Sequence, residues 1–146
     1  MSLIKIHLDR KSPNKSPKKK AYKEGLRYYS EKENRMFRST WEVELAELLT
    51  SLGITYEYEP TRFYYRDHKE SYLPDYYLPE YDTFIECKGY MDKRSLKRCQ
   101  LFRKYQGDTY GFFLYEKEER ELILNEPALI YTYLGIAQEE LRRRQS

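Results

Sequence analysis

The hydrophobic positions of this chain of 146 residues change from a helical period to a period of two near residue 53. An apolar stripe with helical spacing runs from Trp41 to Leu52, after a capping residue at Ser39 or Thr40, and Gly53 is a natural stop. Residues 54–59 alternate with period two and predict a strand. Residues 62–78 predict a hairpin whose polar turn is the segment RDHKE.

The second half of the chain continues with strands and helices in turn. We expect a strand over 83–88, a basic helix over 92–106, a buried strand over 109–115 and an edge strand over 121–124. Pro127 suits the first turn of a last helix. Towards the N-terminus, residues 3–8 read as a short strand able to pair with a sheet edge, and residues 21–38 as mixed helix and loop. This order predicts an α/β domain with a mixed central β-sheet flanked by helices.

Composition narrows the class of protein. The length suits one modest core, and no apolar run approaches the roughly 18 residues that span a bilayer. The N-terminal residues lack the apolar centre of a secretory signal. Two cysteines without a CxxC pair indicate a reducing compartment, and with only two distant histidines they argue against zinc. We therefore expect a cytoplasmic protein of a bacterium or of a phage-infected host, with no membrane partner.

Charge divides the chain unevenly. Residues 1–38 contain 12 Lys or Arg against 4 Asp or Glu, whereas the remaining residues contain 15 against 20. Residues 11–20 carry five lysines and two prolines, which is typical of a flexible basic linker. We expect a basic N-terminal arm and linker over 1–38 that binds a polyanion, followed by a domain over 39–146. A solubilising tail is the alternative.

Charged residues interrupt the apolar strand over 83–88. Side chains alternate along a strand, so Glu86 and Lys88 share one face. Taken alone, they could form a surface ion pair. Asp75 lies in the preceding strand, where antiparallel pairing can bring it within about 5 Å of Glu86. Two such carboxylates repel each other unless a cation or a proton lies between them, and oxygen ligands favour Mg²⁺ or Mn²⁺.

A third carboxylate is expected from the helix after Ser39. Glu42 lies at the margin of the apolar stripe, so it can point toward the sheet, whereas Glu44 lies on the polar side and is expected in solvent. A carboxylate at a core margin needs a partner, and the metal site can provide one.

These residues match a known sequence motif. "PD" at 74–75 followed by "ECK" at 86–88 matches the motif of the PD-(D/E)XK nuclease superfamily, and "STWE" resembles its helical glutamate element. With "YEYEP", "YLPDYYLP" and "FIECKG" in the same order, residues 38–90 most resemble phage endonuclease I-type Holliday-junction resolvases. More distantly, the block is similar to transposon end-cleaving nucleases.

The resemblance implies a restriction-endonuclease-like core and a Mg²⁺-dependent DNA endonuclease, with Mn²⁺ as a substitute. In that family, Asp75, Glu86, the main-chain carbonyl of Cys87 and the helical Glu42 would hold the metal, and Lys88 would be needed for hydrolysis. Attack by an activated water would leave 5′-phosphate and 3′-hydroxyl ends. Selectivity for branched DNA and a homodimer with exchanged N-terminal segments are what the junction-resolving relatives imply.

DNA needs positive charge near such an acidic centre. Candidate DNA-binding residues lie in the arm, ahead of the helical glutamate, and on the basic helix. They are Lys18, Lys19, Lys20, Arg35, Arg38, Lys93, Arg94, Lys97 and Arg98. The alternatives are a transposition-type or general phage nuclease that acts with a protein partner, a catalytically inactive nucleic-acid-binding module, and a structural protein in which the motif is incidental.

Overall fold

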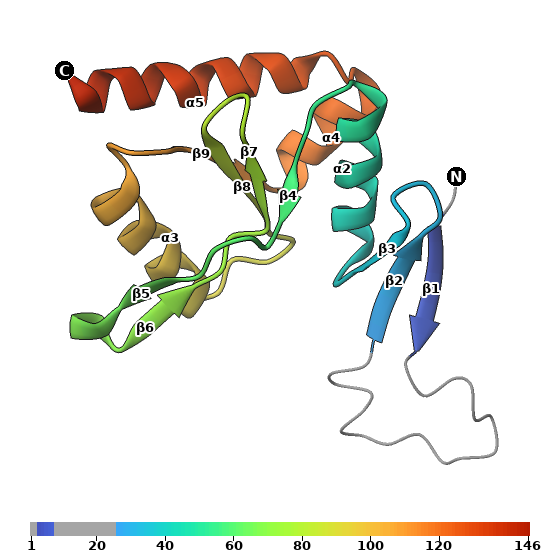
Figure 1. The fold of residues 1–146 in the computed structure, drawn as a ribbon, viewed down its shortest axis with the longest axis horizontal. Coiled ribbons are helices and arrows are strands. Elements are labelled where there is room, and N and C mark those ends of the chain that lie inside the picture. Colours follow the sequence, from blue (N-terminus) through green and yellow to red (C-terminus); the bar gives the residue numbers. More distant parts are fainter. Residues whose placement is uncertain (1–2, 8–25) are drawn as a thin grey trace. The chain divides into compact units, whose positions relative to one another are not determined.

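The computed structural model of this protein describes residues 3–7 and 26–146. The chain divides into two compact units, residues 1–53 and residues 54–146 (Figure 1). Glu42 belongs to the first unit, and Asp75, Glu86 and Lys88 belong to the second. The division into an arm over 1–38 and a domain over 39–146, which charge suggested, stays a prediction.

The N-terminal unit pairs three antiparallel strands with one helix. The strands are β1 (Leu3–His7), β2 (Leu26–Ser30) and β3 (Arg35–Phe37), in that order across the sheet. The helix α2 (Thr40–Ser51) packs against β2 and β3, and the buried Ser30 hydroxyl donates to the Glu47 carboxylate at 2.7 Å. After α2, Gly53 takes a φ of +75°, which L side chains adopt only with strain.

The expectation of mixed helix and loop over 21–38 is wrong for residues 26–30 and 35–37, which are strands. The turn between them depends on Asn34, whose φ is 56° and whose N–H donates to the Ser30 carbonyl. Asparagine tolerates this left-handed conformation, so the chain can reverse its direction here and β3 can pair with β2. The strand expected near the N-terminus is present as β1, and its partner is β2 of the same chain.

The C-terminal unit contains a four-stranded mixed sheet, which confirms the expected α/β class. Its strands are β4 (Glu57–Tyr58), β7 (Tyr76–Leu78), β8 (Thr83–Cys87) and β9 (Gly111–Tyr115), in the order β4-β7-β8-β9. The first three strands are antiparallel neighbours, whereas β8 and β9 are parallel. Parallel neighbours need a crossover, and α3 (Lys93–Gln106) supplies it. The strand predicted over 54–59 is reduced to β4.

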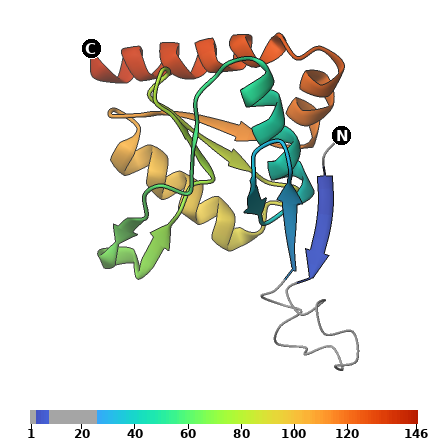
Figure 2. The same ribbon diagram turned by 45° about the vertical axis from the view of Figure 1, so that its right-hand side comes forward.

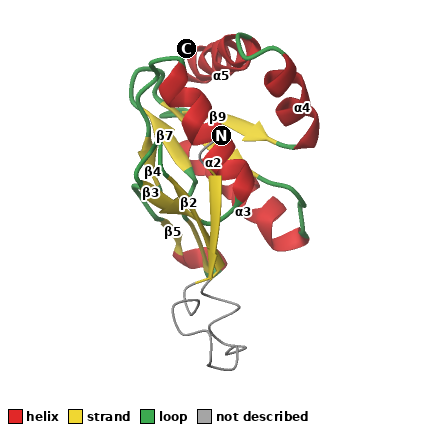
Figure 3. Ribbon diagram, turned by 90° about the vertical axis from the view of Figure 1, so that its right-hand side faces the viewer, coloured by secondary structure: helices red, strands yellow, loops and turns green. Residues whose placement is uncertain are grey.

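Helices cover both faces of this sheet. In Figure 3, β9 lies between α3 and the last helix α5 (Leu129–Gln145), with α4 (Lys117–Asn125) before α5. On the α5 face, the Phe113 and Tyr133 rings stack with centroids 4.9 Å apart. On the α3 face, Phe102 packs against Phe84 at 5.5 Å. The expected helix over 92–106 is confirmed, with Asp92 as its N-cap.

A hairpin beside α3 completes the core (Figure 2). It consists of β5 (Phe63–Tyr65), a short 3₁₀ turn over Arg66–His68, and β6 (Glu70–Tyr72), so the turn lies within the predicted segment RDHKE. The hairpin predicted over 62–78 is wrong beyond Tyr72, because residues 76–78 form β7 of the four-stranded sheet. The buried members of this aromatic cluster come from the hairpin, α3 and the sheet. They are Tyr65, Tyr72, Phe84, Cys99, Leu101, Phe102 and Phe112.

The edge strand predicted over 121–124 is wrong, because these residues lie in α4. A reciprocal capping box starts this helix: the Glu116 N–H donates to the Glu119 carboxylate at 3.0 Å, and the Glu116 side chain accepts from the third helical residue. Glutamate, lysine and leucine also favour helix, and only Ile123 of the apolar run is buried. The last helix starts at Leu129, two residues after Pro127. Within the described ranges, no helix is long and apolar enough to cross a membrane.

We predict that Phe102→Ala destabilises the C-terminal unit by about 3–5 kcal/mol, because Phe102 is fully buried among other aromatic rings. Urea unfolding followed by circular dichroism measures the loss. Leu96→Ala on the same helix is the matched control, since Leu96 is 47% exposed, and it should cost less than about 1 kcal/mol. Equal losses in the two variants would show that the aromatic cluster is not the core of this unit.

Candidate active site

Asp75 lies in a bend directly before β7, and Glu86 lies on the neighbouring strand β8. The antiparallel pairing of β7 with β8 begins one residue after Asp75, where Tyr76 pairs with Ile85. Both carboxylates are buried, with 7% and 6% of their surface exposed. Burial, and after it the negative charges of both carboxylates, raise the pKa of Tyr72, so both carboxylates lie near this side chain, and their convergence on one cation stays a prediction.

A hydrogen bond from a neighbour holds one oxygen of each carboxylate. The Cys87 N–H donates to Asp75 Oδ2 at 2.8 Å, and the Tyr72 hydroxyl donates to Glu86 Oε1 at 2.7 Å. Burial raises the pKa of Tyr72 well above its ordinary value, and the negative charge of Glu86 raises it further. The tyrosine therefore keeps its proton and remains a donor to Glu86.

Lys88 is the charged neighbour of this pair. Its Nζ lies 3.8 Å from Glu86 Oε2, and its side chain is 25% exposed, so the amine lies where the buried site meets solvent. The Lys88 N–H donates to the Tyr115 carbonyl at 3.0 Å, which holds the end of β8 against β9. The pKa of Asp92 is lowered by the Ser95 N–H first and by the charge of Lys88 to a smaller degree.

The donor chemistry of the site fits Mg²⁺ or Mn²⁺. The two buried carboxylates supply hard oxygen ligands. The Cys87 N–H points toward Asp75, and an extended residue directs its carbonyl to the same side of the strand. Among residues 3–7 and 26–146, no group of three or more His, Cys, Asp or Glu side chains is arranged to hold a metal. The candidate ligands of the C-terminal unit are therefore two side chains and one carbonyl.

Glu42, the expected third carboxylate, has a structural role in the N-terminal unit. It is 5% exposed, and its Oε1 accepts from the Arg38 N–H at 2.9 Å. Its own N–H donates to the Ser39 hydroxyl at 3.2 Å, so it stabilises the start of α2. The spacing of serine and glutamate in "STWE" is also a capping-box signature. Its role as a metal ligand stays a prediction. Glu44, expected in solvent, is half-buried.

Two of the predicted DNA-binding residues on α3 are engaged in ion pairs. The Nε atoms of Arg94 and Arg98 each lie 3.1 Å from a carboxylate oxygen of Glu70. These contacts fasten α3 to β6, the strand that carries Tyr72. Lys93 and Lys97 are exposed on the same helix.

The other predicted DNA-binding residues belong to the N-terminal unit. Arg35 is exposed, with its guanidinium 5.5 Å from the Phe37 ring centroid. Arg38 is also exposed. Lys18, Lys19 and Lys20 lie outside the described residues.

Sequence reasoning missed Tyr72 and Glu70 as supports of the site. Both lie in the segment that precedes Asp75, and Glu70 was assigned to a polar turn. The available signals were a glutamate beside a predicted strand and a tyrosine three residues before Asp75. Neither signal identifies a partner 14 to 28 residues away.

Comparison of the chain with models of protein families, with curated proteins and with solved structures found no match.

Glu70→Gln is predicted to reduce the dependence of stability on pH. Hydrogen bonds from Arg94 first and Arg98 second hold the pKa of Glu70 at about 2, below its ordinary 4.5. The stabilisation by Glu70 is therefore complete above pH 4.5 and is lost as the pH falls toward 2. Urea midpoints measured through this range should fall less in Glu70→Gln than in the wild type. Glu121→Gln, which removes an exposed carboxylate, should follow the wild type. Parallel curves for wild type and Glu70→Gln would rule out this role.

Proposed function

We propose that this protein is a Mg²⁺-dependent endonuclease that hydrolyses phosphodiester bonds in DNA, with a restriction-endonuclease-like core. The observation that carries the proposal is the pair of buried carboxylates, Asp75 directly before β7 and Glu86 on the neighbouring β8, with the amine of Lys88 at 3.8 Å from Glu86. The sequence motif that contains these residues, "PD" followed by "ECK", favours hydrolysis of phosphodiester bonds as the reaction. The cytoplasm is the proposed compartment.

Asp75, Glu86 and the Cys87 carbonyl would hold the cation, with Glu42 as the proposed further ligand. When bound, Mg²⁺ would neutralise charge on the scissile phosphate and acidify a water molecule. The burial of both carboxylates favours this role, because two negative charges held near each other in a site of low dielectric constant repel, and a bound cation would offset that repulsion. The ion pair with Lys88 offsets one of the two charges.

Other groups of the protein position the carboxylates and the substrate. Tyr72 and the Cys87 N–H fix the carboxylates, so that a bound phosphate meets ligands already in place. Lys88 lies at the solvent margin, where its ammonium can donate to a phosphate oxygen and stabilise the charge that develops there. Attack by water oxygen forms one P–O bond while the bond to the 3′ oxygen breaks. A proton then reaches that oxygen and gives a 3′-hydroxyl and a 5′-phosphate.

The proposed substrate is DNA, contacted by basic side chains around the site. Lys93 and Lys97 are exposed on α3, which follows the strand of Glu86 directly. The arm lysines, Arg35 and Arg38 are further candidates. Branched DNA is the substrate that the resemblance to junction resolvases favours.

Asp75→Asn and Glu86→Gln should each lower the rate of Mg²⁺-dependent DNA cleavage by about a hundredfold or more, because each removes a charged ligand of the cation. Lys88→Ala should lower the rate to a similar extent while leaving DNA binding in place. Gel assays on a four-way junction, a flap, a plain duplex and a single strand, each with Mg²⁺ and with chelator, measure the loss. Glu121→Gln is the matched control, since it changes an exposed carboxylate remote in sequence from the motif.

Nicking by Asp75→Asn at the wild-type rate would exclude the proposed site. DNA binding without cleavage by the wild type under all these conditions would instead favour an inactive nucleic-acid-binding module. If Glu86→Gln raised stability and changed neither activity nor binding, Glu86 and Lys88 would be a structural ion pair only.

DNA affinity should depend on α3 through counterion release. Replacing both Lys93 and Lys97 by Gln should reduce the slope of log affinity against log salt by about two, because two phosphate contacts are lost. Glu70→Gln should increase the slope, because it releases Arg94 and Arg98 from their ion pairs. Fluorescence anisotropy with labelled DNA in the presence of chelator separates this effect from cleavage. Unchanged slopes in both variants would show that α3 does not contact DNA.

A further inference from the structure

β9 has one edge with which no described strand pairs. β9 is the last strand of the sheet order β4-β7-β8-β9, and among the described residues only β8 pairs with it. The Gly111 N–H donates to the Asp82 carbonyl, and the Tyr115 carbonyl accepts from the Lys88 N–H. Residues 111 and 115 thus point toward β8. Because backbone groups alternate along a strand, Phe112 and Leu114 direct their N–H and C=O groups to the open edge.

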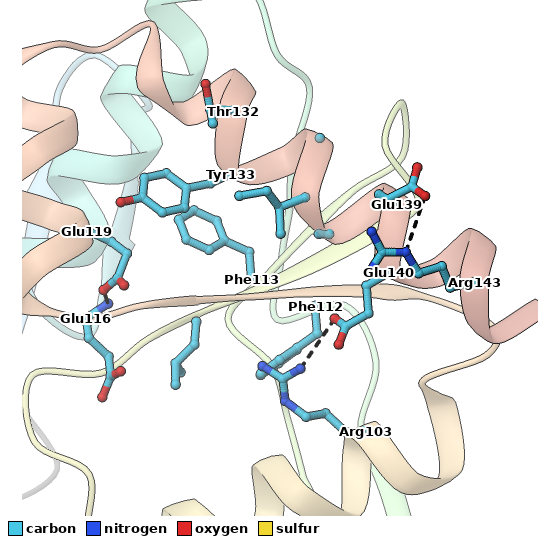
Figure 4. A pocket seen from close by; sticks show the side chains of 14 residues that line it. Arg103, Phe112, Phe113, Glu116, Glu119, Thr132, Tyr133, Glu139, Glu140 and Arg143 are labelled. Atoms are coloured by element: carbon cyan, nitrogen blue, oxygen red, sulfur yellow. Dashed lines mark hydrogen bonds and ion pairs between the residues drawn. The ribbon is translucent and has the colours of Figure 1, made fainter.

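This edge lies in a groove of about 670 Å³ between α3 and α5. Figure 4 shows the Phe113 and Tyr133 rings along its α5 wall and Arg103 of α3 on the other side. On α5, Ile136 lines the groove and is 60% exposed, the most exposed aliphatic side chain among the large hydrophobic residues of the described chain. The groove therefore combines unpaired backbone groups with an exposed apolar contact.

Among the described residues, an ion pair and a hydrogen bond from Arg144 to the Arg103 carbonyl join α5 to α3 around the edge. Arg103 of α3 and Glu140 of α5 lie 3.5 Å apart (Figure 4), and the two helices cover opposite faces of the sheet, so the pair must pass around β9. The Arg103 guanidinium also lies 4.9 Å from the Phe112 ring centroid. Both partners are 38–42% exposed, so solvent screens the pair and an incoming strand can displace it. Edge strands are commonly protected in this way.

The chain segments at the two ends of the groove carry opposite net charge, whereas the lining itself holds Glu116 and Glu119 at one end and Arg103, Arg143, Glu139 and Glu140 at the other. At the end of β9 that leads into α4, residues 116–121 contain four glutamates against one lysine and one arginine. At the other end, residues 139–144 contain three arginines against two glutamates, and Arg103 adds a further positive charge. Turning the groove by a half-rotation therefore places each acidic end against a basic end. A surface with this property is self-complementary, as an interface between two identical subunits requires.

We propose that the β9 edge binds the β9 edge of a second copy of this chain in antiparallel pairing about Phe113. In this register, Phe112 of each copy exchanges backbone hydrogen bonds with Leu114 of the other, so all the outward N–H and C=O groups of both residues are satisfied. Ile136 is covered, and Arg103 exchanges its contact with Glu140 for the acidic end of the other copy. The interface uses no residue of the N-terminal arm and does not depend on the proposed nuclease function.

Sedimentation velocity of the full chain, from low to high micromolar concentration, tests the proposal. The wild type should show a reversible dimer. Ile136→Glu should weaken it by about tenfold or more, because it places a charge in the covered contact. Leu124→Glu is the matched control: Leu124 is 46% exposed on α4, does not line the groove, and its replacement should leave the dimer unchanged.

Glu140→Gln should act in the opposite direction and tighten the dimer by about threefold, because it removes the ion pair that crosses the edge. A monomer at all concentrations, or a dimer that Ile136→Glu leaves intact, would overturn the proposal. The second result would instead favour exchange of the N-terminal arms. Circular dichroism spectra of the variants verify that each is folded.

Discussion

The C-terminal unit depends on holding two carboxylates near each other beneath an aromatic layer. Asp75 and Glu86 are nearly excluded from solvent. Burying a charge in a protein interior costs several kcal/mol unless hydrogen bonds or opposite charges compensate it. Their neighbours offset this cost through geometry: a backbone N–H from the same strand as Glu86, a tyrosine hydroxyl from the hairpin and an ammonium at the margin. In these three contacts, each donor reaches one oxygen of one carboxylate.

The aromatic cluster makes this arrangement possible. Phe102 of α3 contacts Phe63 of the hairpin at 5.3 Å and Phe84 of β8 at 5.5 Å, so it ties the element carrying Tyr72 to the strand carrying Glu86. The ion pairs of Glu70 with Arg94 and Arg98 fasten the same hairpin to the exposed side of α3. The packing of the aromatic rings therefore positions the hydroxyl of Tyr72 for its hydrogen bond to Glu86.

The predictable part of the site follows from short-range periodicity. Alternation along β8 placed Glu86 and Lys88 on one face, and the turn between β7 and β8 placed Asp75 near Glu86; both are properties of a few consecutive residues. The pairing of Glu70 with Arg98 joins positions 28 residues apart and depends on how α3 packs on the hairpin, which periodicity does not encode. The segment over 121–124 was misjudged because three consecutive apolar residues fit a strand as well as a helix, and the capping glutamates decide between them.

The sheet links the candidate site to the free edge. β8 carries Glu86 and has two neighbours in the sheet. It pairs with β7 on one side and with β9 on the other. A half-rotation about an axis through Phe113 would create the strand order β8-β9-β9-β8, in which the two β8 strands are separated by three intervals of about 4.8 Å. Within one copy, Glu86 of β8 is level with Leu114 of β9, and Phe84 is level with Phe112. In the proposed pairing, Leu114 lies opposite Phe112 of the second copy. Glu86 is therefore level with Phe84 of the second copy. With an offset of two residues, the two glutamates would lie about 16 Å apart on the same face, before sheet twist is considered. This is less than one turn of duplex, about 34 Å. Under the proposed nuclease function, this spacing would bring two candidate centres within reach of one branch point, which a single copy could not do.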